Sequence, residues 1–335
     1  MFKQIADSTV IYKHPVVVDP DLNPLIVDAF KQQMAGRSKI EAHWQKLGGT
    51  PGKALSDLEG AGAGYRIRYE HGAIYTGPKG TAWVYGAIGA KYNALGSAKS
   101  WLGLPTADEA PFPEGGRVST FENGAIYWWP DVGAIDLNNV VVHYTGLICF
   151  GETTWDQGSD SDEPYVVLGV VSPTGNNAQR TQVYQDVDGG ESRPDLVEIY
   201  RGKPYGLNIS ALLMEHDFDD PDRYKWAMAA SVETAGLGLS ALIGLIPDVG
   251  PYLAVAAAIG LQAAKPTLTN ELNKLLDTQD DRLGTFTRTL TAKEMVVLAA
   301  RVLNSEEKGI GYKIASPLIS SQGASYKVYF GVVPA

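Results

Sequence analysis

The sequence predicts an α+β protein, mainly β, with a repeat module over 40–138 and an antiparallel β-sandwich over 139–335. Three observations support this class. The 335 residues include 37 glycines and 10% aromatic residues, a composition typical of turn-rich β structure. A unit of about 50 residues occurs twice in the first half. In the second half an apolar run, 226–264, interrupts a series of short strands, and we expect a helical hairpin inserted over 223–276.

Residues 1–39 form a lead-in, with a strand expected at VIYKHPVVV and a helix at PLIVDAFKQQM. The N-terminus lacks the continuous apolar segment of a Sec signal, so we expect a secreted or cell-surface protein that uses another route, or that is stored in the cytoplasm before release. The net charge of −10 argues against nucleic-acid binding. The single cysteine, Cys149, lies in an apolar run and is expected to be a buried thiol.

From Ile40 the sequence repeats itself. IEAHWQKLGG at 40–49 recurs as IGAKYNALGS at 88–97, and EHGAIYTGPKGTAWVYG at 70–86 recurs as ENGAIYWWPDVGAIDL at 122–137. The first segment recurs after 48 residues and the second after 52. We attribute the four additional residues to an insertion near 111–114. Each unit is predicted to be a short helix, a glycine-rich turn and a hairpin, with a turn at Asn123-Gly124 in the second copy.

The segment 101–137 resembles an LGFP repeat, a module of bacterial cell-envelope proteins that is thought to hold them to wall glycan. LGLP at 102–105 corresponds to the tetrapeptide that gives the family its name, and the GAIYW segment of the family is complete. The first copy has ALSDLEGAGAG at the corresponding place, without an LGxP sequence. The resemblance implies a two-repeat module that binds cell-wall glycan.

Aromatic side chains are the candidates for glycan contact, because sugar rings stack on aromatic faces while nearby polar groups orient them. Two of the candidates are neighbours on one predicted strand, so they point to opposite faces and one of them should meet solvent. The alternative is that these side chains pack the core of the repeats. The predicted glycan contacts are Trp83, Trp101, Trp128 and Trp129.

From Val140 many short strands separated by Gly, Pro and Asp turns indicate an antiparallel sandwich. SDEPYV at 161–166 is similar to the SDPYV segment of C2 domains, with one additional residue. Asp217-Phe218-Asp219 is similar to the Asp-x-Asp of the C2 calcium loop, and DRLG at 281–284 resembles a later element of that family. The chain departs from the family by placing the apolar run between the last two segments. The resemblance implies a C2-like sandwich with a calcium site.

Three acidic clusters, 156–163, 215–222 and 277–281, hold 12 of the 38 acidic residues. A calcium ion takes about six to eight oxygen ligands, and it would relieve the repulsion among clusters that meet at one end of a sandwich. The alternative is that these carboxylates are solvated turn formers. The predicted ligands of Ca²⁺ are Asp156, Asp162, Asp217, Asp219 and Asp281.

The apolar run has only two charges between its ends, Glu233 and Asp248. PDVGP at 247–251 divides it into two helical legs, whose uncharged parts are 234–247 and 249–264. At about 1.5 Å per residue they reach roughly 21 and 24 Å, less than a bilayer core of about 30 Å. We expect the hairpin to be buried in the soluble form, with segments 270–277 and 292–303 as covering helices, and to meet a membrane after release. The predicted membrane contacts are Leu242, Ile243, Leu245, Ile246, Tyr252 and Leu253.

The sequence contains no nucleophile elbow, zinc-protease motif, phosphate loop or Cys-x-x-Cys motif. We therefore expect a non-enzymatic bacterial protein that binds envelope glycan and acts at a lipid membrane in a calcium-dependent, toxin-like or effector role. One alternative is a metal-dependent hydrolase targeted to the wall by its repeats. Another is a structural surface protein in which the hairpin is only core.

Overall fold

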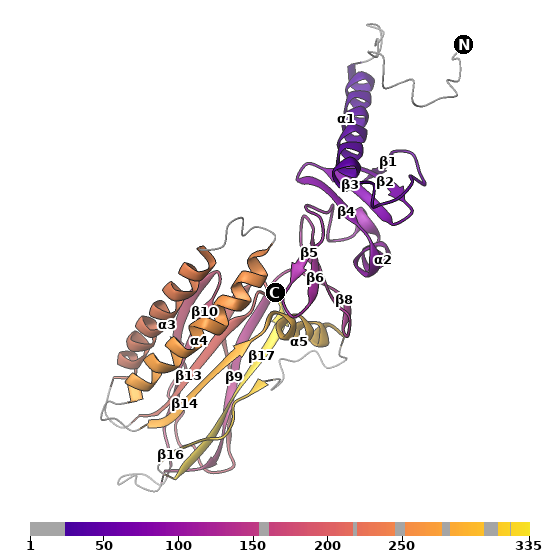
Figure 1. Ribbon diagram of the computed structural model, residues 1–335. Coiled ribbons are helices and arrows are strands. Elements are labelled where there is room, and N and C mark those ends of the chain that lie inside the picture. Colours follow the sequence, from indigo (N-terminus) through magenta and orange to yellow (C-terminus); the bar gives the residue numbers. More distant parts are fainter. Residues whose placement is uncertain are drawn as a thin grey trace, which may run out of the picture.

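The computed structural model describes residues 24–153, 161–216, 220–244, 252–276, 282–304, 314–321 and 323–335. Within these residues a long helix leads into two small sheets, which are followed by a larger sandwich with two helices on its outer face (Figure 1). The α+β class, mainly β, is confirmed. The strand expected at VIYKHPVVV lies outside the described residues.

The first repeat consists of one helix and one antiparallel sheet. Helix α1 spans Pro24–Lys46 without interruption, so the expected domain boundary at 39/40 falls inside it. Its C-terminal turns place Ile40 and Trp44 against Ile67 and Ile74 of the sheet, in a small core of their own. The strands pair in chain order as β1 (Glu59–Ala61), β2 (Gly64–Tyr69), β3 (Gly72–Gly77) and β4 (Gly80–Val84).

The second repeat follows the same plan, with α2 (Gly86–Ala94) as its helix. Ile88 and Tyr92 correspond to Ile40 and Trp44, and α2 packs between β3 of the first repeat and β7 and β8 of the second. Each unit is therefore a helix followed by a four-stranded meander, and the expected hairpin is its central part. The strands, again in chain order, are β5 (Ala110–Phe112), β6 (Gly116–Thr120), β7 (Ala125–Trp129) and β8 (Gly133–Leu137).

A glycine beside a glutamate marks equivalent positions in the two repeats. Gly103 has φ +72° and packs on Glu122, whose carboxylate also accepts the N–H of the residue after the glycine at 3.0 Å. Gly52 has φ +84° and stands in the same relation to Glu70, with a corresponding hydrogen bond of 2.9 Å. The LGLP tetrapeptide therefore corresponds to PGKA at 51–54, and not to ALSDLEGAGAG.

This equivalence shows where the four additional residues lie. The helices align at Ile40 and Ile88, the glycines at Gly52 and Gly103, and the paired strands β2 and β3 align with β6 and β7. The turn before β8 holds one further residue, because Gly77 pairs with Gly80 in the first repeat and Trp129 pairs with Gly133 in the second. Three of the residues are therefore inserted between helix and glycine, in the turn that holds the short 3-10 helix η2 (Ser97–Lys99). Only the fourth belongs to the turn between β5 and β6, where the whole insertion was expected.

The chain from Val140 forms two facing antiparallel sheets, as predicted. One sheet has the order β11-β10-β13-β14, and the other has the order β12-β9-β17-β15, with β16 paired to β17. Cys149 is buried in the core between them. The strands are β9 (Val140–Gly151), β10 (Pro164–Ser172), β11 (Gly175–Arg180), β12 (Ser192–Gly202), β13 (Leu207–Glu215), β14 (Arg282–Leu290), β15 (Ile314–Ala315), β16 (Ile319–Ser321) and β17 (Ala324–Pro334).

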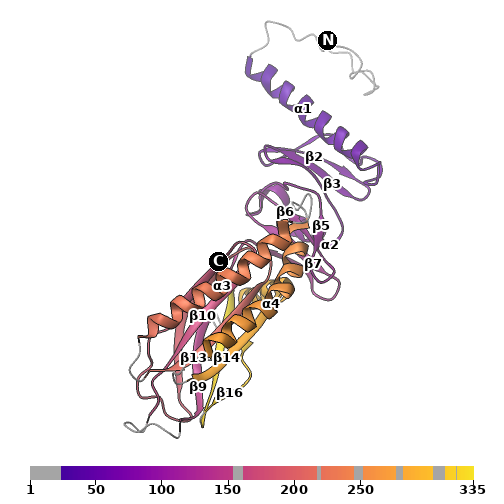
Figure 2. The same cartoon turned by 60° about the vertical axis from the view of Figure 1, so that its left-hand side comes forward.

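The apolar run forms the expected hairpin. Helices α3 (Pro221–Gly244) and α4 (Leu253–Leu276) lie side by side on the outer face of the β10-β13 sheet (Figure 1 and Figure 2). Every residue of β10 and β13 is buried, because successive side chains face the sandwich interior and the hairpin in turn. Leu168, for example, belongs to the interior core, whereas Val167 belongs to the core under the hairpin.

The two segments that were expected to cover the hairpin do not do so. Segment 270–277 is not a separate helix: residues 270–276 are the end of α4, which continues past Pro266. Helix α5 (Ala292–Asn304), the second expected cover, packs on β17, β9 and β8. The hairpin therefore has one face on the sheet and one face toward solvent.

The second repeat and the sandwich share one hydrophobic core. Tyr127 and Trp129 of β7 belong to the same buried cluster as Tyr144 of β9 and Met295 of α5. Helix α5 also packs on β8, so it covers the second repeat as α2 covers the first. The repeat module is thus closed at this end by the sandwich.

Candidate functional site

Trp101 is the most exposed of the four tryptophans predicted to contact glycan, with 46% of its surface accessible. The indole N–H of Trp101 donates to Oδ2 of Asp136 at 3.0 Å. The side-chain amide of Asn123 donates to the main-chain carbonyl of Trp101 at 3.0 Å. The benzo edge of the ring lies over Gly124, where a Cβ atom would come within 2.6 Å of it. The indole is therefore fixed in orientation while much of its surface stays open.

Asp136 links this indole to a cation. Nζ of Lys91 lies 2.8 Å from Oδ1, so each carboxylate oxygen has its own partner. Burial raises the pKa of Asp136, but the hydrogen bonds from Lys91 and Trp101 outweigh burial and the net pKa is lowered. The carboxylate is thus ionised at neutral pH. We call Trp101, Asp136, Lys91 and Asn123 the Trp101 platform, which combines an aromatic surface with the donors and acceptors that orient a sugar.

Trp83 and Trp128 are half-buried. Trp83 stacks on Tyr85 with ring centroids 3.9 Å apart, and its indole N–H donates to the carbonyl of His71 at 2.7 Å. Trp128 packs against the core between the two repeats. Part of each ring remains accessible, so both stay predicted contacts beside Trp101.

Trp129 is fully buried, which corrects the expectation that it could meet a sugar. Its indole N–H donates to the carbonyl of Pro113 at 3.0 Å, and its ring meets Phe112 edge to face at 5.7 Å. The strand does turn its two neighbouring tryptophans to opposite faces, but the face of Trp129 is the one that the sandwich covers.

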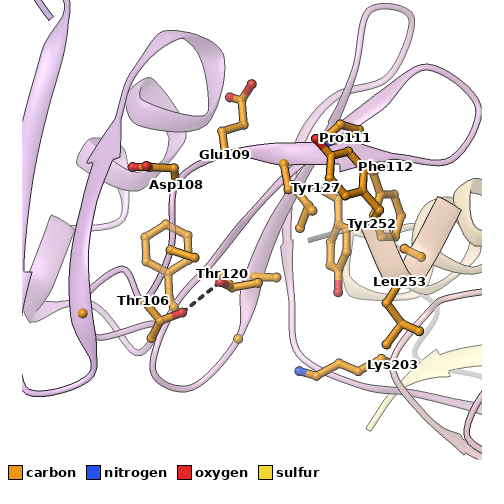
Figure 3. A pocket seen from close by; sticks show the side chains of 18 of the residues that line it. Thr106, Asp108, Glu109, Pro111, Phe112, Thr120, Tyr127, Lys203, Tyr252 and Leu253 are labelled. Atoms are coloured by element: carbon orange, nitrogen blue, oxygen red, sulfur yellow. Dashed lines mark hydrogen bonds between the residues drawn. The ribbon is translucent and has the colours of Figure 1, made fainter. Parts of the chain in front are cut away.

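A cavity of about 830 Å³ opens where the two repeats meet the sandwich (Figure 3). On one side the hydroxyl groups of Thr106 and Thr120 are paired at 2.8 Å. On the other side lie Phe112 and Tyr127 of the second repeat, with Lys203 extending from the turn between β12 and β13. Sequence reasoning missed this cavity because its lining comes from segments that are far apart in the chain. Tyr252 and Leu253, at the start of α4, complete the lining.

The two carboxylates of the cavity are already paired within the protein. Oδ1 of Asp108 accepts the main-chain N–H of Trp83 at 2.8 Å and lies 2.8 Å from Nε2 of His43. Oε1 of Glu109 lies 2.6 Å from Nε of Arg117. Asp108 therefore joins the second repeat to the first, and Glu109 forms an ion pair with Arg117.

Asp162 is the one predicted calcium ligand within the described residues. Its buried carboxylate accepts hydrogen bonds from the main-chain N–H of Thr153 at 3.0 Å, from the Thr153 hydroxyl at 2.8 Å, and from the hydroxyl of Tyr326. These contacts tie β17 to the segments beside β9 and β10. The other four predicted ligands, Asp156, Asp217, Asp219 and Asp281, lie outside the described residues.

The register of the sheet places the flanks of the three acidic clusters together. Pro164 is paired with Glu215, and Met214 is paired with Arg282, so the described strand ends next to the clusters are neighbours at one end of the sandwich. Among the described residues, no group of three or more His, Cys, Asp or Glu side chains could hold a metal ion.

Helix α3 is long and apolar enough to cross a membrane, a property that core helices of soluble proteins share. Of the predicted membrane contacts, Leu242 and Tyr252 are exposed by 38% and 52%, and Ile243 and Leu253 are half-buried. Leu245 and Ile246 lie outside the described residues.

A family model described as the LGFP repeat matches residues 52–100 and 102–142. No curated protein matches the chain. The resemblance of the second half to C2 domains is not confirmed and stays a hypothesis. LGFP repeats are generally associated with binding to cell-surface components, which agrees with an extracellular or cell-surface location. The chain therefore carries two consecutive LGFP repeats, and these are consistent with a surface-associated or cell-wall-associated protein.

Proposed function

We propose that the protein docks on cell-envelope glycan through its repeats, with the Trp101 platform as the principal contact. The observation that carries the proposal is an exposed indole that Asp136 fixes before any ligand arrives. A side chain that is already ordered loses little conformational entropy on binding. Lys91 and the outer edge of Asp136 can then donate to and accept from the sugar hydroxyls.

Co-sedimentation with purified, insoluble cell wall tests this proposal. Truncation of an anchoring tryptophan costs about 2 kcal/mol or more, so Trp101→Ala should weaken wall binding by at least about tenfold. Trp226→Ala is the matched control, because it removes an exposed tryptophan (72% accessible) from α3. Equal binding by the parent and both variants would contradict the proposal.

The outer face of the hairpin supports a second role, action at a membrane. Leu237 on α3 and Ile259 on α4 are exposed by 67% and 62%. The described residues of the hairpin between Glu233 and Lys265 include no charged side chain. An uncharged helical surface with large exposed apolar side chains suits contact with a lipid interface.

A liposome leakage assay tests the membrane role. The double variant Leu237→Glu with Ile259→Glu should abolish leakage, because two carboxylates would enter the lipid interface. Leu196→Glu, at a leucine of β12 that is 58% exposed, is the control and should leak like the parent. No leakage by the parent at neutral or acid pH, with or without Ca²⁺, would refute the membrane role.

Calcium dependence is supported by the strand register that makes the flanks of the acidic clusters neighbours. Calorimetric titration with CaCl₂ should show binding to the parent and none to Asp217→Asn combined with Asp219→Asn. Asp28→Asn, on the exposed side of α1, is the control. An unchanged affinity in the double variant would place any bound calcium elsewhere.

A further inference from the structure

The cavity between the repeats and the sandwich is lined by two ammonium groups that are paired with no carboxylate among the described residues. Nζ of Lys203 donates to the side-chain oxygen of Asn138 at 2.7 Å, and Lys46 lies at the end of α1. The carboxylates of Asp108 and Glu109 are held by other groups, as described above. The ammonium groups of Lys46 and Lys203 are therefore the charged groups of the cavity that an anionic ligand could pair with.

Lys203 is held at its place by the turn between β12 and β13. Its carbonyl accepts the hydroxyl of Tyr200 at 2.6 Å and the N–H of Tyr205 at 2.8 Å. Burial lowers the pKa of Lys203, as expected for an ammonium group that is partly withdrawn from water without a counter-charge. An anionic ligand would supply that charge and form a charge-assisted hydrogen bond.

The remaining lining is suited to a sugar. The paired hydroxyls of Thr106 and Thr120 offer donors and acceptors, while Tyr252, which is 52% exposed, offers aromatic surface above the buried Phe112 and Tyr127 (Figure 3). The cavity volume of about 830 Å³ falls within the range of small-molecule sites, about 300–1,000 Å³. Ammonium, hydroxyl and aromatic groups together match a sugar ring that carries an acidic substituent.

We infer that this cavity binds a carboxylated sugar unit of the envelope glycan, with Lys203 paired to the carboxylate and with Thr106 and Thr120 bound to ring hydroxyls. The inference rests on the proposed function, because the sugar belongs to the glycan on which the repeats dock. Tyr252 and Leu253 line the same cavity, so the bound sugar would touch the start of α4.

Titration of the full chain with N-acetylmuramic acid and with N-acetylglucosamine tests the inference, because the first sugar differs from the second by a carboxylate-bearing ether group. The parent should bind the acidic sugar at least about tenfold more tightly. Lys203→Met should remove this preference, and Lys203→Arg should retain it in part. Glucuronic acid against glucose repeats the comparison with another carboxylate geometry.

Backbone NMR signals of the parent provide a measurement that needs no variant. Addition of the acidic sugar should shift the amide signals of Thr120, Lys203 and Tyr252. Unshifted signals, equal affinity for the acidic and the neutral sugar, or an unchanged preference in Lys203→Met would each overturn the inference. A parent that binds cell wall but shows no preference for the acidic sugar refutes the inference alone. If Trp101→Ala binds cell wall as tightly as the parent, the proposed function is refuted.

Discussion

Replacing Trp129 by alanine removes a large side chain from the core that the second repeat shares with the sandwich. The ring is fully buried, packs on Phe112, and donates to the carbonyl of Pro113. Truncating a buried tryptophan costs about 3–5 kcal/mol, and the carbonyl left without its partner adds to the cost. This is a large part of the stability of an ordinary domain, about 5–15 kcal/mol. Trp101→Ala, which removes a ring that is 46% exposed, should cost clearly less.

Guanidinium unfolding, followed by near-ultraviolet and by far-ultraviolet circular dichroism, measures this effect. Because Trp129 and Tyr144 belong to one core, both signals of Trp129→Ala should shift together to lower denaturant concentration. A loss of less than about 1 kcal/mol in the free energy of unfolding would refute the shared core. So would a far-ultraviolet transition of the sandwich that stays in place while the repeats unfold earlier.

Three further changes test other parts of the structure. Asn208→Ala removes an amide that donates to the carbonyl of Leu261 at 2.9 Å, so it should cost about 1–3 kcal/mol and speed hydrogen exchange in α4. Gly103→Ala should lower the melting temperature more than Gly115→Ala, because both glycines have φ near +70° but only at Gly103 would the new Cβ meet a glutamate carboxylate. Burial lowers the pKa of His143, because the folded state disfavours the charged imidazole. The protein therefore has its full stability above the ordinary pKa of 6.5, and it loses stability as the pH falls toward the lowered pKa. His143→Gln should flatten this part of the stability curve measured by thermal unfolding. Equal effects of the two glycine changes, or unchanged exchange or pH dependence, would contradict these assignments.

The repeats were predictable because they leave a direct trace in the sequence. The recurrence of Ile40 and Trp44 as Ile88 and Tyr92 identified the helix of each unit. The alignment of Gly52 with the LGLP tetrapeptide was not predictable, because the second repeat has three additional residues between its helix and Gly103. The conformation of the glycine, together with its glutamate neighbour, reveals the equivalence.

The hairpin shows a different limit of sequence reasoning. Its apolar composition predicted two helical legs, with the uncharged part of the second leg at 249–264 and a separate covering helix at 270–277. Helix α4 continues instead, and the Asn208 amide binds the carbonyl of Leu261, one turn before the proline. The carbonyl that Pro266 leaves without a helical N–H is that of Gln262, so the hydrogen bond from β13 to the neighbouring carbonyl of Leu261 ties the helix to the sheet beside the proline. Only the folded arrangement brings this side chain there.

The exposure of the tryptophans depends on the same kind of distant contact. Alternation along β7 correctly separated Trp128 from Trp129. It could not tell which face would be covered, because the covering residues, such as Tyr205 and Met295, lie far along the chain. For Trp101, the partner that fixes the ring is Asp136, 35 residues away.

The indole N–H signals of the seven tryptophans in a ¹H–¹⁵N NMR spectrum, recorded with and without a soluble cell-wall glycan fragment, test the central claim most directly. Trp101→Phe assigns one signal. That signal should shift on addition of glycan, while those of the buried Trp129 and of Trp226 on α3 stay in place. A spectrum in which the Trp101 signal does not move at saturating glycan, or in which only other signals move, would contradict the account.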